Sequence, residues 1–265
     1  MTLFEGKIIW ITGASSGIGE CLVYSFIRRG ATVIASSNEP TELERVKKNC
    51  GDLSGKVVCV PFDLSDTSGI EKTVREQIGL TGKIDYLLNI GGISQRATIA
   101  DTPIWLDRKI MEINYFGTIA LTKAVLPFMI GQKSGHVLAT SSISGRFGFP
   151  LRSAYSASKQ ALHGFFETLF IENRKYNIRS SVIIPGRVRT KISYRALDAE
   201  GKEHGKLDAG QSKGISPEKA AEMIIRGIMR NKREILVGSS ELIMLYIRRY
   251  FPSLFFSLAD KIKST

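Results

Sequence analysis

The chain has 265 residues, of which 43% are hydrophobic, and a formal net charge of +12 from 37 Lys and Arg against 25 Asp and Glu. A single α/β domain often reaches this length and can bury a large core. The positive charge permits nucleic-acid binding, but no recognition motif or concentrated basic run accompanies it, so we expect no nucleic-acid partner.

Cysteines and histidines are few: Cys21, Cys50, Cys59, His136, His163 and His204. The cysteines are an odd number without metal-ligand spacing and the histidines are scattered, so we predict free thiols and no metal site. Free thiols suit a reducing compartment, so the cytoplasm is the expected location. No run of eighteen uncharged apolar residues occurs, and the first strand begins close to Met1, so we expect neither a spanning helix nor a signal peptide.

Apolar runs and helical periodicity alternate along the chain. The expected strands are 7–12, 32–36, 56–60, 84–89, 135–141, 178–184 and 234–238. The expected helices are 17–29, 40–50, 66–79, 103–131, 153–176 and 216–231. This alternation predicts an α/β fold with a doubly wound parallel sheet of about seven strands and helices on both faces.

Several polar and glycine residues lie at or just after the ends of these strands. They are Gly13, Asp63, Asn89, Ser142 and Pro185. Right-handed crossovers bring the C-terminal ends of parallel strands to one edge of the sheet. We therefore expect these residues to converge on the crevice where such folds bind ligands.

The first strand leads directly into a glycine-rich turn and a helix, a context that a lone glycine triplet lacks. The glycines let the backbone approach a ligand closely, and the helix N-terminus offers free N–H groups and a positive dipole end. The segment therefore predicts a pyrophosphate site. The residues expected at the ligand are Gly13, Ser15, Ser16, Gly17, Ile18 and Gly19.

Tyr155 and Lys159 are four residues apart, and Ser142 lies thirteen residues before Tyr155. Positions i and i+4 share one helix face, so the ammonium can lie beside the phenol. A phenol titrates near pH ~10, and a close cation lowers that pKa, which makes tyrosine a usable general acid or base. Alone, this pair is typical of an exposed helix surface. The spacing favours Ser142 over the adjacent Ser141 as the hydroxyl that steadies a substrate oxygen.

The motifs follow one another in a distinctive order. They are Thr12-Gly13-x-x-x-Gly17-x-Gly19, Asp63-Leu64, Asn89-Ile90-Gly91-Gly92, Asn114, Ser142, Tyr155-x-x-x-Lys159 and Pro185-Gly186-x-Val188-x-Thr190. In this order they resemble the short-chain dehydrogenase/reductase family, over residues 5 to about 240. The family commonly has Asn-Asn-Ala-Gly where this chain has Asn89 to Gly92. We expect the turn to be intact and its packing to differ.

The resemblance implies one Rossmann-fold domain over residues 1–240 that binds NAD(P) and carries the catalytic residues Asn114, Ser142, Tyr155 and Lys159. It further implies that Asp63 contacts the adenine, that Thr190 contacts the carboxamide, and that Lys159 also holds the nicotinamide ribose. Asn114 would position a water that replaces the proton, although alone it would be a packing residue. The other implied cofactor contacts are Ser37, Asn38, Leu64, Asn89, Gly91, Tyr155, Pro185, Gly186 and Val188.

The end of the second strand bears on the choice of cofactor. An acid there would hold the ribose of NAD and repel a 2′-phosphate, but Ser36, Ser37 and Asn38 are uncharged. NADP is therefore favoured. No arginine or lysine stands at Asn38 or Ser16, and Glu39 does not help a phosphate, so NAD remains the alternative.

Two segments near the C-terminus are expected to shape the substrate site. Residues 191–212 are polar and irregular, as in a substrate lid, and their nearly balanced charges indicate a solvated surface. Arg187 and Arg189 would attract an acidic substrate or would be solvated. The tail, residues 241–265, is apolar and basic, and Pro252 should divide it. It would pack over the pocket, against a second subunit, or at a membrane surface as in relatives that handle lipids.

These features predict an NADP-preferring enzyme that transfers hydride between nicotinamide and a carbonyl or secondary alcohol, lipid-like molecules included. One alternative is a 3-oxoacyl reductase that acts on an acidic carrier protein. Another is a non-catalytic dinucleotide sensor, which would be free to lose Ser142, Tyr155 or Lys159. The family resemblance also implies a homodimer or homotetramer that uses the helices 103–131 and 153–176.

Overall fold

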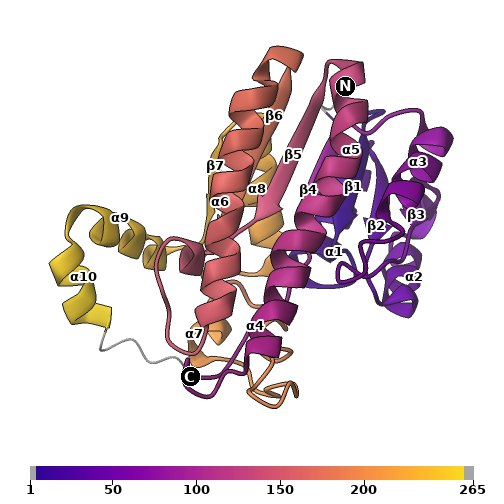
Figure 1. The fold of residues 1–265 in the computed structure, drawn as a ribbon. Coiled ribbons are helices and arrows are strands. Elements are labelled where there is room, and N and C mark those ends of the chain that lie inside the picture. The colour runs from indigo at the N-terminus through magenta and orange to yellow at the C-terminus, as the bar shows by residue number, and fades with distance from the viewer. Residues whose placement is uncertain (1–3, 260–265) are drawn as a thin grey trace.

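The computed structural model describes residues 4–259. A seven-stranded parallel sheet has the order β3-β2-β1-β4-β5-β6-β7 (Figure 1). Its strands are β1 (Ile8–Thr12), β2 (Thr32–Ser36), β3 (Val57–Cys59), β4 (Tyr86–Asn89), β5 (Gly135–Thr140), β6 (Ile178–Pro185) and β7 (Glu234–Val237). The order reverses between β1 and β4, and a crevice at such a point is where doubly wound sheets bind ligands.

Helices cover both faces of the sheet, as predicted. The longer ones are α1 (Gly17–Ile27), α2 (Pro40–Lys48), α3 (Ile70–Thr81), α4 (Ile104–Met111), α5 (Thr118–Gln132), α6 (Ser153–Asn173) and α8 (Pro217–Met229). Helices α1 and α8 pack together on one face, while α3, α5 and α6 cover the other (Figure 1). The short turns are η1 (Gly51–Lys56), η3 (Ile143–Gly145), η4 (Arg174–Tyr176), α7 (Ala209–Ser212) and η5 (Ser240–Leu242).

Strand β1 shows why its sequence is apolar throughout. Ile9 and Ile11 belong to the core with α1 and α8, whereas Trp10 belongs to the core with α3, α5 and α6. Successive side chains of a strand point to opposite faces, and both faces of a parallel sheet are covered. A continuous apolar run therefore fills two cores at once.

The predicted helix 103–131 is interrupted by a wider turn. Helix α4 ends at Met111, a π-helical turn, η2 (Glu112–Gly117), follows, and α5 then continues. At Gly117 a Cβ would lie 2.2 Å from the carbonyl oxygen of Leu64, so η2 touches the loop after β3 backbone to backbone. Such turns are frequent at functional sites. One extra residue in an apolar helix leaves no mark on the sequence periodicity.

Helix α3 begins four residues later than the predicted 66–79. Asp66 accepts hydrogen bonds from the backbone N–H and the hydroxyl of Ser68. This local turn competes with helix formation, as short polar side chains commonly do.

The helical stretch Ile104–Gln132 is long and apolar enough to cross a membrane by length and composition. The expectation of no spanning helix counted only uncharged runs, and Lys123 interrupts this one. Leu121, Val125 and Met129 are buried against the sheet. One face of this stretch therefore packs on the sheet.

Two short helices, α9 (Ile243–Tyr250) and α10 (Pro252–Ala259), follow β7 and lie to one side of the sheet (Figure 1). They are divided at Pro252, as predicted. Phe255 is buried with its ring centre 4.9 Å from that of Phe147. Other large side chains of the tail are exposed: Ile243, Tyr246, Tyr250, Phe251, Leu254 and Phe256. The tail thus packs by one side and presents an apolar surface on another.

Candidate active site

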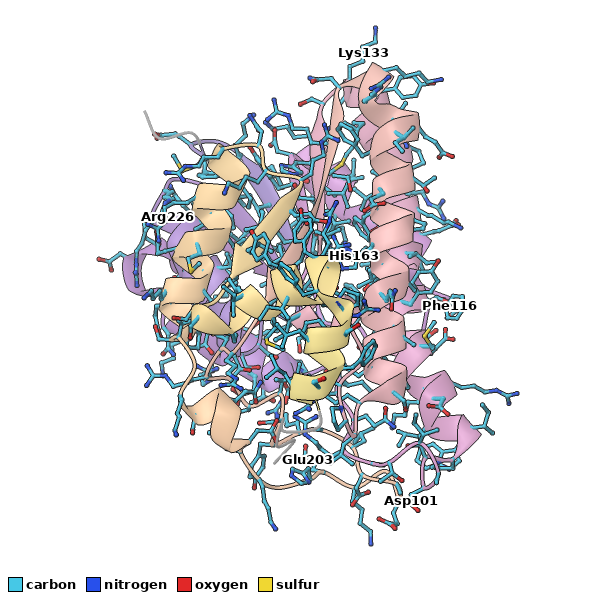
Figure 2. The ribbon with its side chains drawn as sticks, turned by 90° about the vertical axis from the view of Figure 1, so that its left-hand side faces the viewer. Asp101, Phe116, Lys133, His163, Glu203 and Arg226 are labelled. Carbon is cyan, nitrogen blue, oxygen red and sulfur yellow. The ribbon has the colours of Figure 1, made fainter. Side chains whose placement is uncertain are left out.

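A cavity of about 1160 Å³ opens at the C-terminal edge of the sheet. Its wall comes from the turn after β1, from the ends of β2, β4, β5 and β6, from the segment 185–211, and from the tail. The segment 185–211 pairs with the loop after β4, where Leu197 bridges to Gln95, and Figure 2 shows Glu203 and Asp101 at the same end of the molecule. The crevice predicted from the strand ends is therefore present.

The turn between β1 and α1 lets a ligand approach the backbone. Gly13 and Gly17 have φ values of +65° and +56°, and a Cβ at Gly13 would lie 2.7 Å from the backbone of Gly91. A Cβ at Gly19 would lie 2.1 Å from a carbonyl oxygen. Ser16 precedes α1 without a side-chain capping bond, so the first N–H groups of the helix remain available to an anion. This geometry fits the pyrophosphate of a dinucleotide.

Three of the predicted catalytic side chains meet between β5 and α6. Tyr155 lines the cavity and is hydrogen-bonded to Ser142, which is extended just before η3. The Nζ atom of Lys159 donates to the carbonyl oxygen of Thr140 at 2.8 Å and lies 5.8 Å from the centre of the Tyr155 ring. A phenol, a hydroxyl and an ammonium are thus held together in a buried place.

Burial shifts the two ionisable groups in opposite directions. It raises the pKa of the Tyr155 phenol, while the hydrogen bond to Ser142 and the charges of Arg152 and Arg96 oppose that rise. Burial lowers the pKa of Lys159 to about 8. The expectation that a close lysine brings the tyrosine pKa below its ordinary value is therefore wrong for the chain alone, because desolvation dominates and the opposing cations are the two arginines.

Asn114 lies in the π-helical turn η2 and is fully buried. Its Oδ1 accepts from the N–H of Ile93 at 2.8 Å, and its Nδ2 donates to the Ile93 carbonyl oxygen and to the Ser158 hydroxyl, both at 3.0 Å. A Cβ on Gly92 would lie 2.8 Å from Asn114 Oδ1 and 3.1 Å from Lys159 Nζ. Asn114 therefore ties the loop after β4 to α6, directly beside the lysine.

Most of the predicted cofactor contacts line the cavity. They are Gly13, Ser15, Ser16, Gly17, Ile18, Gly19, Ser37, Asn38, Asp63, Leu64, Gly91, Tyr155, Pro185, Gly186, Val188 and Thr190. Asn89 is placed elsewhere, since its buried amide donates to the Thr122 hydroxyl and the Leu138 carbonyl oxygen. Lys159 and Asn114 are also absent from the cavity wall and lie behind it.

The two adjacent serines have different partners. The Ser141 hydroxyl donates to the Lys159 carbonyl oxygen at 2.8 Å and contacts Nε2 of His163 at 2.8 Å. The single hydroxyl proton of Ser141 is thus used in a hydrogen bond to the backbone of α6. Ser142, in contrast, is hydrogen-bonded to Tyr155. The geometry favours Ser142, as the spacing does, and His163 is held by Ser141 behind it.

A hydrogen-bonded group closes the end of β2. The Ser37 hydroxyl donates to that of Ser15 at 2.9 Å, which donates to Glu39 at 2.8 Å. Arg195 also donates to Glu39, at 3.0 Å. Partial burial would raise the pKa of Glu39, but the hydrogen bonds from Arg195 and Ser15 hold it below its ordinary value. The basic residue that the sequence lacks near Asn38 thus comes from a distant segment.

Two arginines and an aspartate are wall residues that no motif indicates. Arg96 follows β4, Arg152 precedes α6, and Asp208 lies just before α7, and all three are buried. Asp208 pairs with Arg96 at 2.6 Å and with Arg152 at 2.7 Å. The expectation that the charges of 191–212 are solvated is therefore wrong for Asp208. The three residues are far apart in the chain, so no spacing rule unites them.

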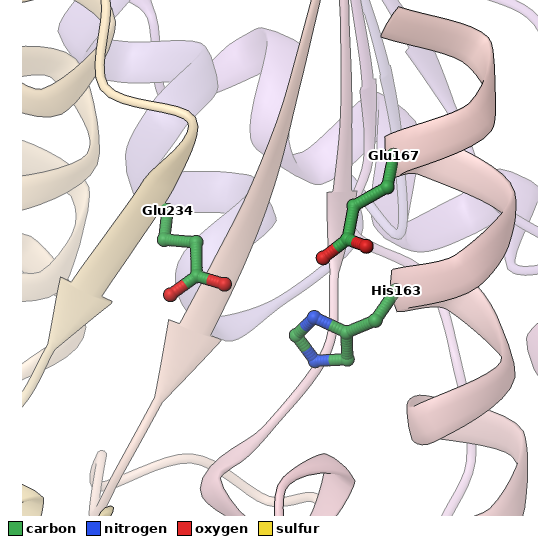
Figure 3. Close-up of side chains that lie close together, drawn as sticks. All are labelled: His163, Glu167 and Glu234. Carbon is green, nitrogen blue, oxygen red and sulfur yellow. The ribbon is translucent and has the colours of Figure 1, made fainter. Parts of the chain in front are cut away.

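One group of described side chains has the composition of a metal site. Atoms of His163, Glu167 and Glu234 that can bind a metal lie within 4.8 Å of one another (Figure 3). The three residues come from α6 and β7, so their spacing in the sequence does not indicate that they meet. Arg146 forms an ion pair with Glu234, which already brings a positive charge to this cluster. The expectation of no metal site stays a prediction.

The sequence of this chain is similar to those of known proteins. A family model described as "short chain dehydrogenase" matches residues 7–201. The chain is 42% identical to a Drosophila melanogaster protein named "Dehydrogenase/reductase SDR family protein 7-like", over 97% of this chain and 80% of that protein. It is 39% identical to the Mus musculus "Dehydrogenase/reductase SDR family member 7B", over 96% of this chain and 80% of that one.

The chain belongs to the short-chain dehydrogenase/reductase family. Among solved structures, a short-chain dehydrogenase/reductase from Burkholderia phymatum in complex with NAD has a TM-score of 0.84 at 22% identity, covering 96% of both chains. An alcohol dehydrogenase from Thermococcus sibiricus complexed with 5-hydroxy-NADP has a TM-score of 0.74 at 23% identity, covering 88% of this chain and 97% of that one. These structures show the shared fold.

Members of the short-chain dehydrogenase/reductase family are oxidoreductases that use a nicotinamide cofactor on small molecules, and they commonly form oligomers. The chain's departure from the family pattern leaves the turn after β4 intact. The N–H groups of Ile90 and Gly91 donate to the Thr12 hydroxyl at 3.1 and 3.2 Å. The Ile90 side chain packs against the apolar core instead of offering an amide.

Proposed function

We propose that this short-chain dehydrogenase/reductase transfers hydride between NADP(H) and a carbonyl or secondary alcohol. The observation that carries the proposal is that Tyr155 and Ser142 line the same cavity as the uncapped N-terminus of α1, with the buried Lys159 beside Tyr155. A proton donor and an anion site for a dinucleotide are thus side by side.

The nicotinamide cofactor, when bound, supplies the hydride donor or acceptor. In reduction, Tyr155 gives its proton to the substrate oxygen, and in oxidation it takes the proton back. Ser142 hydrogen-bonds the same oxygen, where negative charge develops. The phenolate formed in reduction is disfavoured by burial, and the positive charges near Tyr155 offset part of that cost.

Lys159 and Asn114 have supporting roles in this proposal. With a pKa of about 8, Lys159 is mostly protonated at neutral pH and keeps a positive charge beside the phenol. Asn114 lies beside it and binds the loop after β4. We assign to Asn114 the positioning of a water that returns the proton to Tyr155.

NADP is the preferred cofactor in this proposal. The end of β2 carries the uncharged Ser36, Ser37 and Asn38, and Arg195 reaches the same place through Glu39. Glu39 would repel a phosphate, but its charge is paired with Arg195. NADPH should therefore bind more tightly than NADH.

We further propose a cytoplasmic homodimer or homotetramer built through α5 and α6, with the tail over the substrate pocket. All three cysteines are free, which is consistent with a reducing compartment. Ile243, Met244 and Leu258 of the tail line the cavity, which supports packing over the pocket more than membrane contact.

Absorbance at the reduced-nicotinamide band tests the reaction. Purified protein is supplied with NADPH or NADH and a panel of aldehydes, ketones, 3-oxoacyl thioesters and diketones. Turnover with NADPH well above NADH supports the proposal. Binding of NADPH with no turnover of the panel would favour a dinucleotide-sensing protein.

The Tyr155→Phe variant tests the mechanism. We expect its turnover number to fall by about a hundredfold to ten-thousandfold, the usual size of general acid catalysis, while the NADPH dissociation constant stays nearly unchanged. Tyr246→Phe, which changes an exposed tyrosine of the tail, is the matched control. Retained turnover in Tyr155→Phe would contradict the assignment of Tyr155 as the general acid or base.

A further inference from the structure

The buried cluster of Arg96, Arg152 and Asp208 faces the same cavity as Tyr155. The side chains of Arg96, Asp208 and Arg152 are 2%, 8% and 11% exposed. Charged groups are rarely buried so deeply unless they are paired or serve a ligand. The pairing within this cluster is unequal, because two guanidinium groups share one carboxylate.

Arg96 uses four of its five side-chain N–H groups inside the protein. Its Nε and Nη2 donate to the two oxygens of Asp208 at 3.2 and 2.6 Å, which is the bidentate geometry of a strong arginine–carboxylate pair. Its Nη1 donates to the Ser94 hydroxyl at 3.0 Å and to the Gln95 carbonyl oxygen. Arg96 therefore neutralises Asp208, and each of its three side-chain nitrogens already donates within the protein.

Arg152 is less completely satisfied. Its Nη2 donates to an Asp208 oxygen at 2.7 Å, and its Nη1 makes only a long bond of 3.3 Å to the Pro150 carbonyl oxygen. One face of the guanidinium lies 4.6 Å from the ring centre of Phe149. Two positive charges against one negative charge leave the cluster with one excess positive charge, and Arg152 is the member that can offer it.

The position of this charge relates it to the reacting atoms. Arg152 is the N-cap residue of α6 and Tyr155 lies three residues on, and the charge of Arg152 acts on the Tyr155 phenol. The same cavity is also lined by apolar and aromatic side chains: Phe147, Phe149, Ile243, Met244 and Leu258. The cavity thus combines a positive group near the proton donor with an apolar surface.

We propose that Arg152, held in place by Asp208 and Arg96, binds an acidic group of the substrate close to the reacting carbonyl. The substrate class is an oxo compound with a carboxylate or phosphate within a few bonds of its carbonyl and an apolar chain on the other side. Arg152 then determines specificity. This inference rests on the proposed carbonyl chemistry and names its substrate.

A purely structural role would need one arginine for one aspartate. Arg96 alone gives Asp208 a bidentate partner and ties it to the loop after β4. A second buried guanidinium adds a desolvation cost that the shared carboxylate only partly returns. An oxyanion of the substrate would compensate for the remaining desolvation cost. An ester or a free alcohol has no such oxyanion and would leave Arg152 without a full set of partners.

The test compares matched pairs of carbonyl compounds in kcat/KM with the preferred cofactor. The pairs are α-oxooctanoate with its methyl ester, β-oxooctanoate with its methyl ester, and the phosphate monoester of an α-hydroxyketone with the free hydroxyketone. A charge-assisted hydrogen-bonded contact is worth about tenfold to a hundredfold, so we expect wild-type protein to prefer the charged member by that factor. The pair with the larger ratio shows whether the acid is a carboxylate or a phosphate.

Variants assign the preference to one side chain. Arg152→Gln should lose most of it through slower turnover of the charged member, with little change for the uncharged one, while Arg152→Lys should keep part of it. Arg226→Gln removes the same charge from an exposed position on α8, outside the cavity wall, and should keep the preference. A thermal midpoint for each variant shows that it is folded, and Arg152→Lys remains informative if Arg152→Gln is not.

Equal rates for charged and uncharged members in the wild type, or an unchanged preference in Arg152→Gln, would overturn the inference and leave the carbonyl chemistry standing. If no compound is turned over, the proposed reaction fails instead. Dissociation constants for the same pairs, read from the fluorescence of bound NADPH, then test Arg152 alone. The charged member must bind more tightly to the wild type than to Arg152→Gln, and equal binding would reject the site.

Discussion

Tyr155 and Lys159 are buried side by side, and desolvation raises the pKa of the phenol and lowers that of the amine. The charged form of the phenol is the anion, so burial raises its pKa, while the charged form of the amine is the cation, so burial lowers its pKa. Sequence spacing predicts that the two meet, but the depth of burial is a tertiary property. The same holds for Arg152 and Arg96, whose charges reach the phenol from other segments.

The lowered pKa of Lys159 has a measurable effect on stability. Between the folded value of about 8 and the ordinary value of 10.5, the unfolded chain binds more protons than the folded chain. The free energy of unfolding should therefore rise with pH over that window, by up to about 3 kcal/mol at ~1.4 kcal/mol per pH unit.

Denaturant unfolding at several pH values, compared with Lys159→Met, isolates this contribution. The free energy of unfolding of the wild type, minus that of Lys159→Met, should rise from pH 8 to 10.5. The same difference taken with Lys123→Met, which removes an exposed lysine, should not change over this range. A difference that is flat with pH would mean that Lys159 is not buried as described.

Gly19 provides a test of the dinucleotide turn. A Cβ there would lie 2.1 Å from the Gly13 carbonyl oxygen, so Gly19→Ala must move the turn that accepts the pyrophosphate. Overpacking of this kind costs about 1–3 kcal/mol, so we expect NADPH binding to weaken by about tenfold or more.

Titration of NADPH fluorescence measures that loss. In the matched control, Gly79→Ala, the new Cβ on α3 meets no other atom. It should bind NADPH normally and gain about 0.5–1 kcal/mol of stability from the better helix former. Unchanged cofactor binding in Gly19→Ala would argue against this turn as the pyrophosphate site.

At the scale of elements, the tail is the part whose contacts matter most for the substrate. Helices α9 and α10 bring Met244 and Leu258 to the cavity and bury Phe255 against Phe147. Glu241, just before them, accepts from the N–H of Arg187 at 2.8 Å and so supports the strand end. The tail therefore forms part of the apolar wall.

A chain that ends at Leu242 should keep Glu241 and the fold but lose that wall. We expect KM for substrates with an apolar chain to rise, with little change in NADPH binding, because the cofactor turn lies elsewhere. Flotation with anionic liposomes should be the same for both proteins. Flotation that only the full-length chain shows would move the tail from the pocket to the membrane surface.

At the scale of the whole molecule, apolar side chains lie exposed on the helices expected at a subunit interface. Phe116 in η2 is 45% exposed, and Ile171 in α6 is 67% exposed. Figure 2 shows Phe116 on the outer side of its helix. A subunit interface on these helices would cover such side chains.

We expect Phe116→Glu to shift the protein from an oligomer toward a monomer, because a buried unpaired carboxylate disfavours the interface. Light scattering coupled to gel filtration measures the mass. Leu80→Glu changes a side chain on α3 that is 79% exposed and should leave the mass unchanged. A wild type that is already monomeric, or a Phe116→Glu oligomer, would reject this surface.

The sequence by itself determined the parallel sheet, the glycine turn and the pairing of Tyr155 with Lys159, because these depend on local periodicity and on contacts between close neighbours in the chain. It missed the π-helical turn at Asn114, since one inserted residue does not disturb an apolar pattern. Only the tertiary structure decided which distant charges meet. Arg195 reaches Glu39, and Arg96 and Arg152 share Asp208, through strand order and loop packing that no spacing encodes.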